Sequence, residues 1–262
     1  MEGKNIEYFV KSSDLDETKQ SSTVKLFKEK NFDLIFSLTG PATLAAKAEI
    51  SDRPIVFSFV AFPVELGLVS SLKSSNNNLV GTRNWISAED QLSLVKKLVP
   101  SSKKIGFVHR NGSFFSKEII ATAPKYGLKI VDISANDLSN LIETVKNNIK
   151  NIDALYGSCD LLMQNGGDQI MIDLANKNNK PSFSCFETGI KNGALAGIVP
   201  DYYELGRLSG EKAALILDGV APTALETSLI SHPFTYFNQN TANQLGITIP
   251  QSLLIHADHI FP

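Results

Sequence analysis

Short apolar runs alternate with longer amphipathic stretches along most of the chain. In residues 87–99 the apolar positions 88, 92, 95 and 99 fall on one face of a helix. Runs such as 54–60 are short and mostly apolar, which is typical of strands buried on both faces. These patterns predict strands at 5–10, 33–38, 54–60, 104–109, 129–134, 153–158 and 181–186. They predict helices at 19–30, 41–50, 87–99, 115–126, 138–149, 167–178 and from about 203 onward.

This alternation predicts an α/β fold in which parallel sheets are flanked by helices. Two runs of strand–helix units lie on either side of residues 82–100, so we expect two α/β lobes. In open α/β sheets, ligands bind beyond the carboxyl ends of the strands. The residues that follow each strand are therefore where a site is expected, in a cleft between the two lobes.

Composition narrows the function classes. The chain has 262 residues, of which 43% are hydrophobic and 20% are charged, and its formal net charge is −2. This balance gives no support for nucleic-acid or membrane-surface binding. The first 20 residues lack the apolar segment of an export signal, and no apolar run approaches the length that spans a bilayer.

No pattern for catalysis or for a cofactor is present. The nucleophile elbow, the phosphate-binding loop and the dinucleotide-binding glycine motif are all missing, so we expect neither an enzyme nor a bound cofactor. His256 and His259 are three residues apart and would share a face if they lay on one helix, as metal ligands can. A solvated terminal segment explains them more simply, and we expect no metal site.

The predicted strand ends carry the most informative residues. Thr39 and Gly40 follow one strand and lead into a helix that Pro41 opens, where free N–H groups can hold a carboxylate. Trp85 lies where the chain passes from the first lobe to the second. Its ring either packs in the hinge or lines the cleft. Aromatic and acidic residues follow other strands: Phe62, Phe114, Asp160, Phe186 and Glu187.

Each of these phenylalanines could line a cleft or belong to a core. Together they indicate a pocket for a flat or apolar ligand, with a cation held by Asp160. The two cysteines, Cys159 and Cys185, follow successive strands. They could form a disulfide if the protein is exported; two free, part-buried thiols are the more ordinary interpretation.

Several segments match a known family in order and spacing. They are EGKNIEY at the start, DLIF before the helix that Pro41 opens, PIVFSFV followed by PVELGLV, NLVGT, KKIGFV, KNGALA, DYYELGRLSG and LGITIPQSLL. With these segments the chain resembles the substrate-binding proteins of bacterial ABC transporters, in the branch that includes tryptophan- and tyrosine-binding members. The resemblance covers nearly the whole chain.

The resemblance implies a type I periplasmic-binding-protein fold, whose two lobes close on a small, aromatic or heterocyclic solute. The first lobe would take residues 1–84 and 197–224, and the second 85–196 and 225–262. The closed form would dock on an ABC permease, in the periplasm or on the outer face of the cytoplasmic membrane. Tyr202, just after Asp201 at a lobe crossing, would then contact the ligand. A sensory ligand-binding domain is the alternative function.

Two departures from the family pattern bear on this expectation. Phe62 stands where the family usually has Asp, and Phe114 and Phe186 stand where it often has an acidic residue. An ammonium group needs an anionic partner in a desolvated cleft; Asp160 matches a family Asp and is the first choice, and Glu187 is the second. The chain also starts at what resembles the family's second strand, so the first lobe is expected to lack its first strand and helix.

Overall fold

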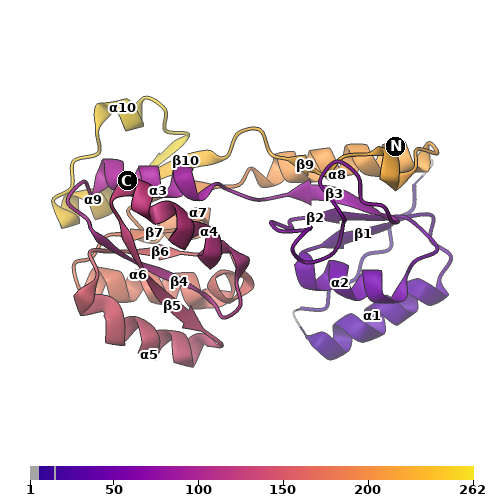
Figure 1. The fold of residues 1–262 in the computed structure, drawn as a ribbon, viewed down its shortest axis with the longest axis horizontal. Helices are drawn as coiled ribbons and strands as arrows, with labels where there is room; N and C mark the ends of the chain where they lie inside the picture. The colour runs from indigo at the N-terminus through magenta and orange to yellow at the C-terminus, as the bar shows by residue number, and fades with distance from the viewer. Residues whose placement is uncertain (1–5, 15) are drawn as a thin grey trace. The chain divides into compact units, whose positions relative to one another are not determined.

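The structure is a computed structural model that describes residues 6–14 and 16–262. The chain divides into two compact units (Figure 1). Unit 1 consists of Met1–Trp85 and Tyr202–Ile230, and unit 2 of Ile86–Asp201 and Ser231–Pro262. The chain therefore passes between units after Trp85, Asp201 and Ile230, whereas the resemblance implies crossings after residues 84, 196 and 224.

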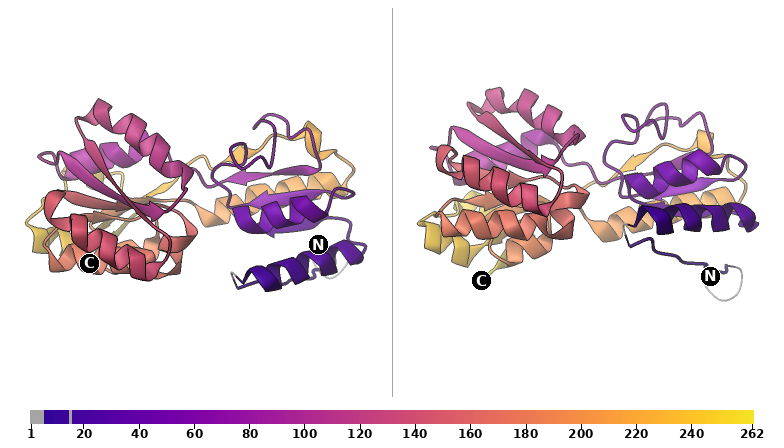
Figure 2. Two further views of the ribbon diagram at one scale, coloured as in Figure 1. Left: turned by 60° about the horizontal axis from the view of Figure 1, so that its bottom comes forward. Right: turned by 90° about the horizontal axis from the view of Figure 1, so that it is seen from below.

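Unit 1 is built on a four-stranded parallel sheet. Its strands follow the order β1-β2-β3-β9, with β1 at Ile35–Leu38, β2 at Ile55–Ser58, β3 at Leu79–Arg83 and β9 at Ser228–Leu229. Helix α2 (Gly40–Glu49) packs on β1 and β2, and α1 (Glu17–Glu29) packs on α2. Helix α8 (Tyr202–Leu217) covers the opposite face over β2 and β3, so the sheet is a middle layer (Figures 1 and 2).

The apolar strands of unit 1 alternate between its two helical layers. Ile35 and Phe57 belong to the core cluster beneath α1 and α2. Val56 and Val80 point the other way and pack with Ile216 of α8. Because successive side chains of a strand face opposite sides, a short apolar run can serve both layers.

A predicted strand at 5–10 is wrong. Residue 5 lies outside the described residues, and of residues 6–10 only Ile6 makes an isolated bridge. Tyr8 and Val10 are 65% and 83% exposed. Phe9 instead packs on Phe27 and Phe32, with ring centroids 5.9 and 5.5 Å away. A β-prone pattern becomes a strand only where a neighbouring strand offers hydrogen bonds, and this segment runs beside α1 instead.

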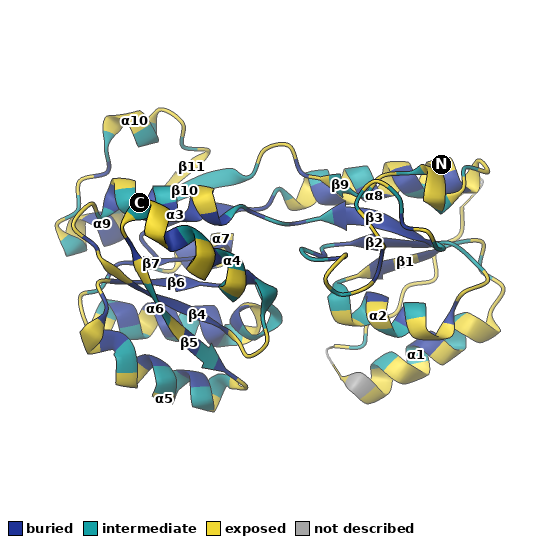
Figure 3. Cartoon of the chain, viewed as in Figure 1, coloured by how far each residue is buried: buried dark blue, intermediate teal, exposed yellow. Residues whose placement is uncertain are grey.

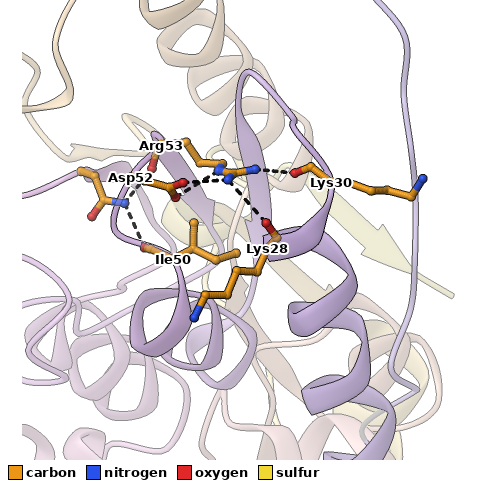
Figure 4. A network of polar contacts seen from close by, with 6 residues as sticks. Lys28, Lys30, Ile50, Asp52 and Arg53 are labelled. Atoms are coloured by element: carbon orange, nitrogen blue, oxygen red, sulfur yellow. Dashed lines mark hydrogen bonds and ion pairs between the residues drawn. The ribbon is translucent and has the colours of Figure 1, made fainter.

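Arg53 ties the end of α1 to the start of β2 (Figure 4). Its guanidinium donates to the carbonyl of Lys30 and, at 3.5 Å, to that of Lys28. Asp52 accepts from the same group, from Nε at 3.1 Å and from Nη2 at 2.7 Å. The side chain of Asn78 donates to the carbonyls of Ile50 and Arg53. The carbonyl groups that a helix leaves open at its end thereby receive donors.

Unit 2 holds a seven-stranded sheet in the order β11-β10-β8-β7-β6-β4-β5. The strands are β4 (Lys104–Arg110), β5 (Lys129–Ala135), β6 (Ala154–Gly157), β7 (Ser182–Phe183), β8 (Ala196–Val199), β10 (Phe234–Asn238) and β11 (His259–Phe261). All neighbours pair in parallel except β10, which runs antiparallel to β8.

Helices cover both faces of this sheet (Figures 1 and 2). The longer helices are α3 (Ala88–Leu98), α4 (Phe114–Thr122), α5 (Leu138–Asn148) and α6 (Asp168–Lys177). Three short ones are α7 (Glu187–Lys191), α9 (Gln239–Leu245) and α10 (Gln251–Leu254). The segment Met163–Gly167 joins β6 to α6 as a wide turn in which Asn165 and Gly166 leave the helical conformation.

The central strands of the unit 2 sheet are buried (Figure 3) and carry several of its largest buried aromatic side chains. Tyr156 of β6 stacks on Phe183 of β7 with ring centroids 5.8 Å apart and planes 2° apart, and Phe107 of β4 lies at 6.4 Å. The α/β fold with helix-flanked parallel sheets is therefore confirmed. Over the described ranges, no helix has the length and apolar character needed to cross a membrane.

Candidate ligand-binding site

In unit 1 the carboxyl ends of β1 and β2 carry unusual backbone conformations. Thr39, after β1, has φ 77° and Phe59, after β2, has φ 62°. The Thr39 N–H donates to the carbonyl of Ser58 at 3.0 Å, which joins the two turns. Left-handed backbone at residues other than glycine concentrates at functional sites. The carboxyl end of this sheet is therefore the candidate region for ligand contacts.

Helix α2 begins directly at this edge. Thr39 is its N-cap residue, but the hydroxyl makes no capping hydrogen bond, and the Thr39 carbonyl accepts from the Thr43 hydroxyl at 2.7 Å. Gly40 is the first helical residue and approaches Leu66 closely: an added Cβ would lie 3.1 Å from Leu66 Cδ1. The first N–H groups of a helix have no partner within it and attract anions. The predicted carboxylate contact at Thr39 and Gly40 stays a prediction.

Aromatic side chains gather at the same end of unit 1. The rings of Phe59 and Tyr202 have centroids 5.6 Å apart and planes inclined by 43°. Tyr202 is the first residue of α8 and is 45% exposed. Sequence reasoning missed Phe59, because the apolar run 54–60 was assigned wholly to a strand that in fact ends at Ser58.

Arg83 contacts the two remaining predicted regions of unit 1, the loop that carries Phe62 and the Trp85 ring. Its Nε donates to the carbonyl of Ala61 at 2.8 Å, next to Phe62, and its guanidinium lies 5.3 Å from the centre of the Trp85 ring. Phe62 and Trp85 are both half-buried. A guanidinium over an indole face is an attractive cation–π contact, so Arg83 fixes both the loop after β2 and the indole.

In unit 2 the predicted phenylalanines differ in burial. Phe114 opens α4, is half-buried and has Lys117 Nζ 5.7 Å from its ring centre. Phe186 is only 9% exposed and packs in the core cluster with Cys185 and Val199. Phe186 therefore lies in core surroundings, as the second of its two interpretations expected, because its ring packs inward after β7.

Asp160 and Glu187 occupy the carboxyl edge of the unit 2 sheet in different ways. The Asp160 carboxylate accepts backbone N–H groups from Arg110 at 2.8 Å, Leu162 at 3.0 Å and Met163 at 3.2 Å. It thus bridges the end of β4 to the turn after β6. Glu187 is exposed at the start of α7, where a negative charge complements the helix dipole. Their roles toward a ligand cation stay predictions.

Cys159 and Cys185 form a disulfide, so the interpretation as two free thiols is wrong. Strands β6 and β7 are neighbours in the sheet, and this adjacency brings the two Cα atoms to 5.8 Å. The bond closes a loop with a sequence separation of 26 residues. Loop-closure entropy makes such a bond worth about 3–4 kcal/mol. It holds together the turns that carry Asp160 and Phe186.

Behind this edge, Asp168 is buried in unit 2 at the start of α6. It is 5% exposed, and its Oδ2 accepts the Ser184 hydroxyl at 2.7 Å. Its Oδ1 has no hydrogen-bond partner among the described residues. Burial raises the pKa of Asp168 to about 7, and the hydrogen bond from Ser184 offsets part of that rise. An added Cβ at Gly189 would lie 2.0 Å from Oδ2, so a larger residue there would displace the Asp168 carboxylate.

The two C-terminal histidines do not share a helix. His256 follows α10, whereas His259 lies in β11 with its ring 4.3 Å from that of Phe261. No cluster of three metal-ligating side chains occurs in residues 6–14 and 16–262. A hollow of about 310 Å³ lies at the amino ends of β2 and β3, lined in part by Arg53, Asn78 and Pro222. It lies at the amino ends of the strands, whereas Thr39 and Phe59 lie at the carboxyl ends.

Two α/β units, each entered more than once by the chain and each carrying a helix-flanked sheet that is parallel or mostly parallel, define the class of type I periplasmic binding proteins. Within that class the chain belongs to the family of ABC transporter substrate binding proteins, which residues 1–261 match. The resemblance found in the sequence is thereby confirmed. This family is made of substrate-binding proteins that act outside the cytoplasm, and it is not an enzyme family.

The chain is similar to a curated protein and to several solved structures; among these relatives, one is named for tyrosine and one was solved with tryptophan. A tyrosine-binding protein of Clostridioides difficile (strain R20291) is 29% identical over 250 residues, which are 94% of this chain and 72% of that protein. The solved ABC domain of Streptococcus pneumoniae in complex with L-Trp has a TM-score of 0.88 at 25% identity and covers 94% of this chain and 84% of its own. A conserved domain protein of Vibrio cholerae has a TM-score of 0.92 at 27% identity, with 99% and 88% covered.

Proposed function

We propose that this chain is the solute-binding component of a bacterial ABC importer and that its solute is an aromatic amino acid. The observation that carries the proposal is the family match over residues 1–261. The similarity to a tyrosine-binding protein and to a domain solved with L-Trp supports the choice of solute. The aromatic residues at the carboxyl edge of unit 1 support it independently, because rings prefer to pack against rings.

The two ends of an amino acid require different partners. On unit 1, Thr39 and Gly40 offer the N-terminus of α2 to the carboxylate, with Phe62, Trp85 and Tyr202 as ring contacts. On unit 2, Asp160 is the proposed partner of the ammonium group, with Glu187 second. Each carboxylate oxygen has two acceptor positions, so the hydrogen bonds that Asp160 already accepts leave capacity for another donor. Phe114 is the remaining proposed contact, whereas Phe186 packs in the core of unit 2.

An ABC permease is the proposed membrane partner, and the periplasm or the outer face of the cytoplasmic membrane is the proposed location. The disulfide between Cys159 and Cys185 supports this location, because disulfides persist in oxidising compartments.

Isothermal titration calorimetry with L-tyrosine, L-tryptophan, L-phenylalanine and L-leucine tests the solute. We expect one aromatic amino acid to bind with one-to-one stoichiometry and to raise the unfolding midpoint, since a ligand that binds only the folded state stabilises it. Failure of all aromatic amino acids to bind would overturn the proposal.

Two analogues of tyrosine separate the proposed contacts. Tyramine lacks the carboxylate and desamino-tyrosine lacks the ammonium group. If Asp160 holds the ammonium, Asp160→Asn weakens L-tyrosine binding but leaves the binding of desamino-tyrosine unchanged. Equal losses for the two ligands would show that Asp160 acts by holding the backbone of its own turn.

A further inference from the structure

Phe59 has a backbone conformation that its side chain does not favour. Its φ of 62° lies in the left-handed region, which is an outlier for a bulky residue. Glycine adopts this conformation without steric cost, and asparagine tolerates it better than most residues. The turn after β2 alone therefore does not explain why a phenylalanine stands at this position.

Core packing does not explain it either. The residues on both sides are almost fully buried, Ser58 at 3% exposure and Val60 at 2%, whereas Phe59 keeps part of its surface exposed. Val60 belongs to the core of unit 1 together with Phe57. The ring of Phe59 instead meets Tyr202 at the start of α8, at 5.6 Å. The left-handed turn thus brings a partly exposed aromatic ring beside a second one.

The place of this pair in the fold is the edge where ligands bind. Phe59 directly follows a central strand of a parallel sheet, and the adjacent turn at Thr39 is hydrogen-bonded to Ser58. In open α/β sheets, ligands lie beyond the carboxyl ends of such strands. An aromatic pair at this edge presents two partly exposed rings, close to the helix N-terminus that would hold a carboxylate.

We propose that Phe59 and Tyr202 form an aromatic corner that receives the ring of the solute, and that Phe59 makes unit 1 select aromatic over aliphatic amino acids. This inference rests on the proposed function, because it assigns the ring-binding part of the same site. It explains why the chain keeps an unfavourable backbone conformation at a residue that the core does not need.

Two substitutions of Phe59 test the corner. Phe59→Asn removes the ring and retains a residue that tolerates the left-handed backbone, so the unfolding midpoint should stay within a few degrees. Its affinity for the preferred aromatic amino acid should fall roughly tenfold or more, as expected for a lost ring–ring contact with its buried area. Phe59→Leu keeps an apolar side chain, so it should bind L-leucine at least as well as the unchanged protein while its preference for the aromatic ligand narrows.

The matched control is Phe36→Leu, the same change at a 42% exposed phenylalanine in β1, which should bind the aromatic ligand like the unchanged protein. The inference is overturned if Phe59→Asn keeps its affinity within twofold. It is also overturned if that variant unfolds many degrees lower, which would mean that the ring serves packing. If the unchanged protein binds no aromatic amino acid, the proposed function itself fails. A variant that binds normally refutes only the role of Phe59.

Discussion

At Asp168, unit 2 buries a carboxyl group whose one hydrogen bond from the described residues comes from Ser184. An unfolded aspartate has a pKa of about 3.9, whereas burial raises the folded value to about 7. Between these values the folded protein keeps a proton that the unfolded chain has lost. Stability is therefore greatest below about pH 4 as far as this group is concerned, falls as the pH rises toward 7, and changes no further above it.

We expect Asp168→Asn to stabilise the protein at neutral pH. Asparagine retains an oxygen that can accept the Ser184 hydroxyl and carries no charge. A shift of about three units corresponds to roughly 4 kcal/mol, so the gain in unfolding free energy should be on the order of 2–4 kcal/mol at pH 8 and small at pH 4. Urea unfolding at pH 4 to 8 measures it. Asp173→Asn, an exposed position of the same helix, is the control and should leave the pH dependence unchanged.

Tyr202 and Tyr203 separate a ligand contact from a structural one at adjacent positions. Tyr202 is 45% exposed and packs against Phe59, whereas Tyr203 is 81% exposed. We expect Tyr202→Ala to weaken binding of the aromatic solute by roughly tenfold and the unfolding free energy by less than about 1 kcal/mol. Tyr203→Ala should leave binding unchanged. Calorimetric titration and urea unfolding of both variants check this; equal losses in binding and stability for Tyr202→Ala would contradict it.

At the scale of elements, Arg53 connects three segments that are distant in sequence. Its guanidinium reaches the end of α1 (Figure 4). Asn78, just before β3, donates to the Arg53 carbonyl and holds the loop before β2. The Arg53 side chain is 13% exposed. A cation near a helix C-terminus also complements the helix dipole. This set of contacts around Arg53, here called the Arg53 clamp, is therefore a structural feature of unit 1. It is remote from the carboxyl ends of the strands, where Phe59 lies.

We expect Arg53→Met to lower the unfolding midpoint by a few degrees without changing solute affinity, because methionine keeps the apolar stem and removes the donors. Differential scanning calorimetry with and without the solute measures both effects. Arg207→Met is the control: this residue pairs with Glu204 and Glu211 on the exposed face of α8, where ion pairs contribute little. A similar loss in both variants would count against the clamp.

The hydrophobic pattern predicted correctly those helices and strands that tertiary packing or strand pairing also supports. The helix 87–99 and the strand 33–38 appear within two residues of their expected bounds, because periodicity and burial agree there. The strand at 5–10 fails for want of a partner, and β3, β8 and the C-terminal strands lacked a pattern distinct enough to assign. Among the candidate site residues, Thr39 could be expected at the end of β1 from the strand pattern, and Tyr202 near a lobe crossing from the resemblance; that they contact a ligand stays a prediction. Phe59 could not be expected from the pattern, because its left-handed turn interrupts an apolar run that reads as continuous.

Taken as a whole molecule, the two units differ in how their sheets end. Strand β1 is at the edge of the unit 1 sheet and pairs over four residues with β2, with Phe36 42% and Leu38 59% exposed. Strand β5 is at the edge of the unit 2 sheet, pairs over seven residues with β4 and packs on α4 and α5. Both are edge strands. They differ in how far helices cover them and in how many residues pair with the neighbouring strand. Few buried contacts and short ladders lower the free energy of local opening.

We therefore expect the amides of β1 to exchange with solvent at least tenfold faster than those of β5, as measured by hydrogen exchange with mass spectrometry. The comparison of two edge strands removes the effect of edge position itself. Because an aromatic solute would contact the turns after β1 and β2, its addition should slow exchange around Thr39 and Phe59 more than at β5. Equal protection of β1 and β5 would mean that the exposed Phe36 and Leu38 do not weaken unit 1, and the ladder length would then be the wrong measure of its stability.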